Sequence, residues 1–64
     1  MLTDAEIARF VAWLEAGADS DDAEAERWRS LKEPHTAWSF TVKALANRTV
    51  AARLLEEHKN RTAP

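Results

Sequence analysis

The sequence predicts an all-α fold: a small three-helix domain formed by residues 1–64. Two observations carry this prediction. Thirteen of the 64 residues are alanine and only one is glycine, and alanine has the highest intrinsic helix propensity. Apolar residues also recur three and four positions apart, which is the period of an amphipathic helix. A fold of tight β-hairpins is disfavoured, because such turns favour residues with positive φ.

The first helix is predicted over residues 4–16. Thr3 followed by Glu6 forms a capping box, in which each side chain satisfies a backbone N–H near the helix start. An apolar stripe at helical spacing follows, formed by Ile7, Phe10, Val11 and Leu14. Gly17 is placed to adopt the left-handed conformation that ends a helix.

The second helix is predicted over residues 21–32, with Ser20 or Asp21 as its cap. Its apolar seam is narrow and consists of Ala25, Trp28 and Leu31. Pro34 is expected to end this helix, because the residue before a proline is disfavoured in α geometry.

The third helix is predicted over residues 37–60, capped by Thr36, and it carries two apolar faces. One face holds Trp38, Val42, Leu45, Thr49 and Ala52. The other holds Val50, Ala51, Leu54, Leu55 and His58. We expect a continuous or kinked helix, with the first face inside the domain and the second against another chain. A break near Asn47 is the alternative, and it is less favoured because no glycine or proline lies there.

A β-strand is a further alternative for the start of this segment. Trp38, Phe40 and Val42 alternate with polar residues, and this period of two is typical of a strand. A single strand would have to pair with another chain.

Charge divides the chain into two halves. Residues 1–33 hold nine acids and four bases, a net −5, and residues 34–64 hold two acids and five bases, a net +3. The simpler interpretation is that acidic and basic helices pack side by side or against another copy. The more specific interpretation is that one half of the chain binds a charged partner.

Neither catalysis nor a cofactor or metal site is expected. The chain has no cysteine, which excludes thiolate ligation. Five of the eleven acids lie in residues 19–26, a run typical of a solvated helix start. The serines lie in no nucleophile motif. Glu57 and His58 fall on different sides of a helix and would not share an ion. A cytoplasmic location is expected, since no basic leader or 18-residue apolar run is present.

We expect a non-enzymatic binding protein that covers a surface of another protein, as an inhibitor or regulator of the antitoxin-like or phage-type host-interference (anti-defence) kind. A chain this short buries only about 60% of its unfolded surface, so a partner or a homodimer is expected to complete it. Tryptophan and arginine are enriched at binding hot spots. The predicted interface contains Arg27, Trp28, Arg29, Phe40, Leu54 and Leu55.

Two alternative functions remain. One is a helix-turn-helix-like regulator that binds nucleic acid, with a turn near Asn47 and residues 48–60 as the recognition helix. It is less favoured, because the basic residues of this half scatter around the helix and the usual glycine-containing turn is absent. The other is a structural or assembly subunit.

Overall fold

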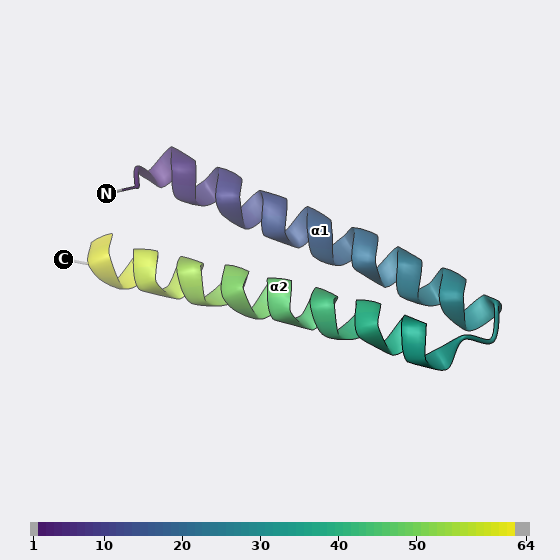
Figure 1. Cartoon of the computed structure of the whole chain (residues 1–64). Coiled ribbons are helices and arrows are strands. Elements are labelled where there is room, and N and C mark those ends of the chain that lie inside the picture. The colour runs from purple at the N-terminus through teal and green to yellow at the C-terminus, as the bar shows by residue number, and fades with distance from the viewer. Residues whose placement is uncertain (1, 63–64) are drawn as a thin grey trace.

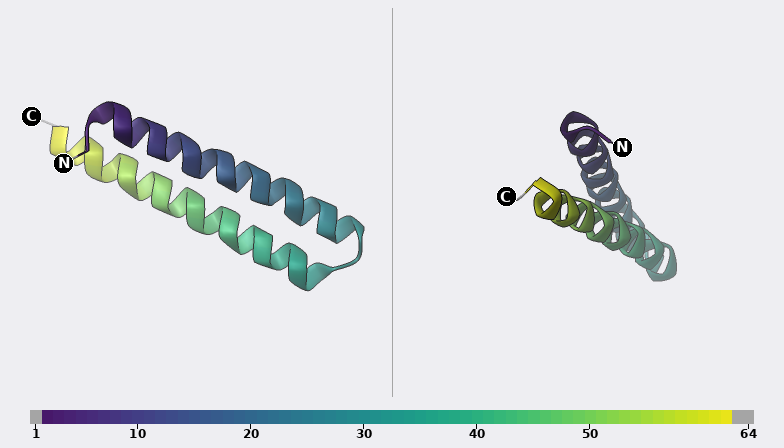
Figure 2. Two further views of the ribbon diagram at one scale, coloured as in Figure 1. Left: turned by 45° about the horizontal axis from the view of Figure 1, so that its top comes forward. Right: turned by 90° about the vertical axis from the view of Figure 1, so that its left-hand side faces the viewer.

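The chain folds as an antiparallel hairpin of two long helices (Figure 1). The computed structural model describes residues 2–62, in which α1 spans Asp4–Ser30 and α2 spans Pro34–Thr62. The hairpin measures 51 × 16 × 14 Å, and the start of α1 lies beside the end of α2 (Figure 2). The all-α prediction is confirmed, and the prediction of three helices is wrong.

The segments 4–16 and 21–32, predicted as two helices, are parts of one helix. Gly17 has no positive φ and lies inside α1, so neither the predicted helix end nor the turn after it exists. The buried row of α1 runs through this point without a change of period, and it consists of Ile7, Val11, Leu14, Ala18 and Ala25. Burial of a continuous row against α2 outweighs the weak helix propensity of one glycine.

The start of α1 is as predicted. The backbone N–H of Glu6 donates to Thr3 Oγ1 at 3.2 Å, and the backbone N–H of Thr3 donates to Glu6 Oε1 at 3.0 Å. The predicted capping box is therefore confirmed.

Three residues connect the helices. Lys32 adopts a left-handed conformation, with φ of 59°. Its N–H donates to Arg29 O and the N–H of Glu33 donates to Trp28 O, both at 3.0 Å, which is the Schellman pattern of a helix C-terminus. Pro34 is then the first residue of α2, where its fixed φ suits a helix start. The predicted cap at Thr36 is wrong.

α2 is continuous through Asn47. The break near that residue and the strand alternative are both wrong. The fully buried residues of α2 recur every seven positions and are Ala37, Ala44 and Ala51. Leu54 packs against the core beside them and His58 is half-buried. The face predicted to meet another chain thus packs against α1 only in part, through Ala51, Leu54 and His58, while its Val50 and Leu55 are exposed. The face predicted to lie inside points to solvent.

The size of the buried side chains changes along the hairpin. Toward the chain ends, Ile7, Val11, Leu14 and Ala51 form the core cluster. Toward the connection, only alanines are fully buried. The helices lie closer together at the connected end than at the open end (Figures 1 and 2). Alanine allows this close approach, but it also leaves the hairpin with a small apolar core.

Candidate functional site

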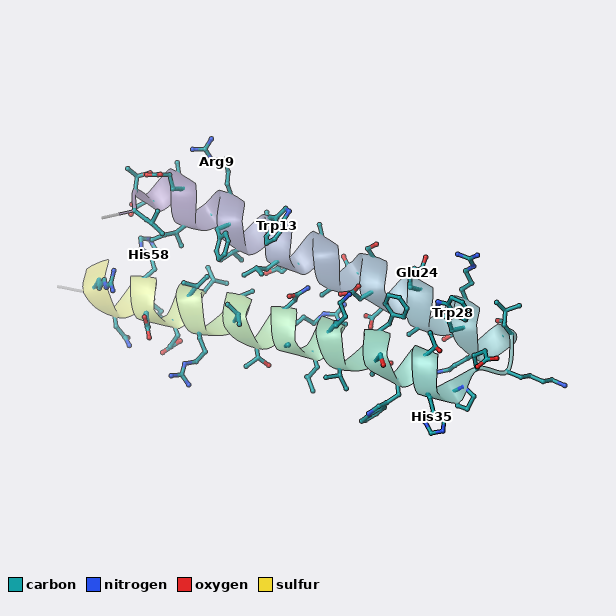
Figure 3. All side chains as sticks on the ribbon, in the orientation of Figure 1. Arg9, Trp13, Glu24, Trp28, His35 and His58 are labelled. Atoms are coloured by element: carbon teal, nitrogen blue, oxygen red, sulfur yellow. The ribbon has the colours of Figure 1, made fainter. Side chains whose placement is uncertain are left out.

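An aromatic pair lies exposed on α1. The rings of Phe10 and Trp13 stack with centroids 5.8 Å apart and planes 24° apart, and Trp13 is 69% exposed. They border a hollow of about 530 Å³, whose lining residues are Leu2, Glu6, Arg9, Phe10 and Trp13. Arg9 points away from α2 (Figure 3). We call these five residues the α1 patch.

Helical spacing explains why these aromatic side chains are exposed. Ile7, Val11 and Leu14 occupy the inner row of α1. Phe10 and Trp13 each precede a member of that row by one position, so both fall on its flank. Phe10 was predicted to lie in the buried stripe, and its 44% exposure shows that this prediction is wrong. Trp13 lies beyond the edge of the stripe and is more exposed than Phe10.

The α1 patch carries one charge of each sign at its rim. The backbone N–H of Thr3, and to a smaller extent its hydroxyl, hydrogen-bonds the Glu6 carboxylate and lowers its pKa. Glu6 is therefore held as an anion by the helix cap. Arg9 follows one turn later and supplies a cation.

A second apolar surface runs along α2. Its residues are spaced alternately four and three positions apart in the sequence, and all of them are exposed. They are Trp38, Val42, Leu45, Thr49 and Ala52. Trp38 is 66% and Leu45 is 65% exposed. We call this surface the outer stripe, because it points away from the inner row of buried alanines.

The first three residues of the predicted interface interact within the hairpin. Trp28 is half-buried and its indole Nε1 is buried without a hydrogen-bond partner. The Arg27 guanidinium lies 5.9 Å from the Trp28 ring centroid and 3.6 Å from a carboxylate oxygen of Glu24. Arg29 bonds Glu26 at 2.8 Å and Thr41 Oγ1 at 3.0 Å.

The other three lie elsewhere on α2. Phe40 is half-buried, with Lys43 Nζ 5.2 Å from its ring centroid. Leu54 packs against the core cluster, and Leu55 is exposed. Phe40 lies toward the connected end, whereas Leu54 and Leu55 lie toward the open end, so the six residues do not form one continuous surface. Their role in an interface stays a prediction.

The opposite net charges of the two halves form ion pairs between the helices. Arg48 on α2 lies 2.9 Å from Asp19 and 2.6 Å from Asp22 on α1. The hydrogen bonds to Asp22 and then Asp19 raise the pKa of Arg48. Near the open end, His58 Nε2 lies 3.4 Å from Asp4 Oδ1. These contacts agree with the simpler interpretation, in which acidic and basic helices pack side by side.

α2 contains no turn at Asn47, so residues 48–60 do not form the separate recognition helix of the nucleic-acid alternative. Within residues 2–62, no group of three potential metal ligands comes together. No helix in that same range is long and apolar enough to cross a membrane.

Comparisons with protein families, curated proteins and solved structures find no match to this chain.

Proposed function

We propose that this chain is a non-enzymatic protein that acts as an inhibitor or regulator by binding another protein through the α1 patch. The observation that carries the proposal is the stacked pair of Phe10 and Trp13 on the surface, with Trp13 69% exposed. Contiguous exposed apolar surface on a small protein marks an interaction site. Tryptophan is also among the residues that most often dominate binding energy.

The area that the hairpin exposes supports a macromolecular partner. Its accessible surface is 5042 Å², whereas a compact monomer of 7.2 kDa exposes about 4,100 Å². Its radius of gyration is 14.7 Å, against about 11 Å for a compact domain of 64 residues. The elongated hairpin therefore exposes about 900 Å² more than a compact monomer of its mass, and an interface of standard size buries roughly 800 Å² on each protein.

The α1 patch defines the chemistry of its partner. An apolar side chain of the partner fits the hollow between Leu2 and the stacked rings of Phe10 and Trp13. A carboxylate beside that anchor pairs with Arg9, whose guanidinium suits a planar, two-pronged contact. The Glu6 carboxylate is already held by the helix cap. The partner is therefore a protein segment with an apolar anchor next to an acidic residue.

The experiment compares capture by matched tryptophan variants. Tagged wild-type chain, Trp13→Ala and Trp38→Ala are incubated with native host lysate, and retained proteins are quantified by mass spectrometry. A partner of the α1 patch is retained by the wild type and by Trp38→Ala and is lost with Trp13→Ala. With the purified partner, Trp13→Ala weakens binding about 30-fold or more, the loss typical of a hot spot of about 2 kcal/mol.

Two results contradict the proposal. One is a partner whose affinity is the same for wild type and Trp13→Ala. The other is that no protein is retained by the wild type in preference to Trp13→Ala. Circular dichroism of both variants shows whether the helices remain intact, since both tryptophans are exposed and neither belongs to the core.

A further inference from the structure

We infer that the outer stripe of α2 binds the outer stripe of a second copy of this chain, with the two α2 helices antiparallel. This surface is separate from the α1 patch, so the inference does not depend on the proposed partner. Four helices would then lie in a row, with α2 of each chain between its own α1 and the α2 of the other chain.

The spacing of the outer stripe is that of a helix-pairing seam. Its members follow one another at steps of four, three, four and three residues, from Trp38 to Ala52, which is the repeat of apolar residues in paired helices. The inner row of α2, from Ala37 to Ala51, has the same repeat and faces α1. The helical period places the two rows about 120° apart. α2 can therefore pack against two helices at once.

The side chains of the stripe fit each other in size only when the helices are antiparallel. The large Trp38 lies at one end and the small Thr49 and Ala52 lie at the other. An antiparallel pair with Val42 opposite Leu45 places each Trp38 against Thr49 of the other chain. A parallel pair would set tryptophan against tryptophan and alanine against alanine, which crowds one end and leaves a void at the other.

The charges beside the stripe also permit this pairing. In the antiparallel register, Arg48 of one chain lies opposite Ser39 of the other and Arg53 lies opposite Pro34, so neither arginine faces a residue of like charge. Arg48 flanks the stripe but already pairs with Asp19 and Asp22 of its own chain. The stripe itself contains no charged residue. A second copy therefore offers a surface that complements the stripe in size and brings no like charges together across the seam.

Solution mass tests the inference directly. The full-length chain, measured by light scattering after gel filtration, is expected at twice its 7.2 kDa. Leu45→Glu places a charge at the centre of the seam and is expected to give the monomer mass. Val50→Glu is the matched control, since Val50 is 47% exposed on the same helix but off the stripe, and it is expected to remain a dimer.

A wild-type mass of one chain at the highest soluble concentration overturns the inference, and so does a larger, open-ended assembly. A monomer would mean that the stripe serves a different protein. Equal masses for the two glutamate variants would show that the contact lies elsewhere.

Cross-linking tests the antiparallel register with small alanine-to-cysteine substitutions, which is possible because the chain has no native cysteine. Ala46→Cys lies beside the two-fold axis, and a short bis-maleimide is expected to join two copies. In Ala52→Cys the two thiols stand about 25 Å apart along the helices, so this variant is not expected to cross-link. If Leu45→Glu fails to fold, the cross-linking of the two cysteine variants still tests the antiparallel pair. Cross-linking of Ala52→Cys, or none of Ala46→Cys, overturns the antiparallel pair.

Discussion

Replacing Lys32 with glycine should stabilise the hairpin. Lys32 is the left-handed residue of the Schellman motif, with φ of 59°. A residue with a Cβ pays about 1–2 kcal/mol for this conformation, because the Cβ comes too close to the following carbonyl oxygen. Glycine avoids this cost but loses more freedom on folding, which cancels about 0.5–1 kcal/mol. The net gain expected for Lys32→Gly is therefore about 0.5–1 kcal/mol.

The assay is thermal and urea unfolding followed by the helical circular dichroism signal. A gain of about 1 kcal/mol raises the Tm of a domain of this size by about 4–8 °C, so a rise of about 2–8 °C is expected. Protein concentration must be equal for all variants, since self-association makes the Tm depend on concentration.

Lys32→Ala is the matched control. It removes the same positive charge from the C-terminal end of α1 but keeps the Cβ. Lys32→Gly should be the more stable of the two by the net gain of about 0.5–1 kcal/mol, because Lys32→Ala keeps the strained Cβ. If the two variants unfold together, the relieved strain does not exceed the entropy that glycine loses and the reasoning is refuted.

Three further predictions concern α1. Gly17→Ala should stabilise the hairpin by about 0.5 kcal/mol in urea unfolding: the new Cβ would stand 3.3 Å from Asn47 Nδ2, but a flexible side chain can give way and alanine favours the helix by about 1 kcal/mol. A loss of stability would show that Asn47 is rigidly held. Thr3→Ala should cost about 1 kcal/mol by removing the cap, and an unchanged urea midpoint would contradict this. Because folding lowers the pKa of Glu6, the stability it contributes is fully present above its unfolded pKa and is lost as pH falls through its folded pKa. Thermal melts should show this acid loss in the wild type and less of it in Glu6→Gln.

Local signals predicted the start of the first helix correctly, but they did not predict the number of helices. The capping box of Thr3 and Glu6 is a short-range hydrogen-bonding pattern, and the structure has it as predicted. Gly17 carries an equally local signal for a helix end, but the helix and its buried row continue through it from Leu14 to Ala18. Only the pairing with α2 determines which signal dominates, and that pairing is not a local property of the sequence.

The inner face of α2 was predicted wrongly for a related reason. Ranking faces by the size of their apolar side chains favours Trp38, Val42 and Leu45 as the core. The structure buries Ala37 and Ala44 instead, because a row of small residues lets two helices approach closely along their length. The seven-residue repeat of these alanines was the signal that would have identified the inner face.

Pro34 also affects whether two copies of this chain can exchange helices. A hairpin with a three-residue connection can exchange helices with another copy if α1 and α2 join into one straight helix. Such a helix would hold Pro34 in its interior, where proline costs about 3 kcal/mol and removes a backbone hydrogen bond. The residue that begins α2 therefore also opposes domain swapping, so that two copies are expected to meet as closed hairpins and not as exchanged ones.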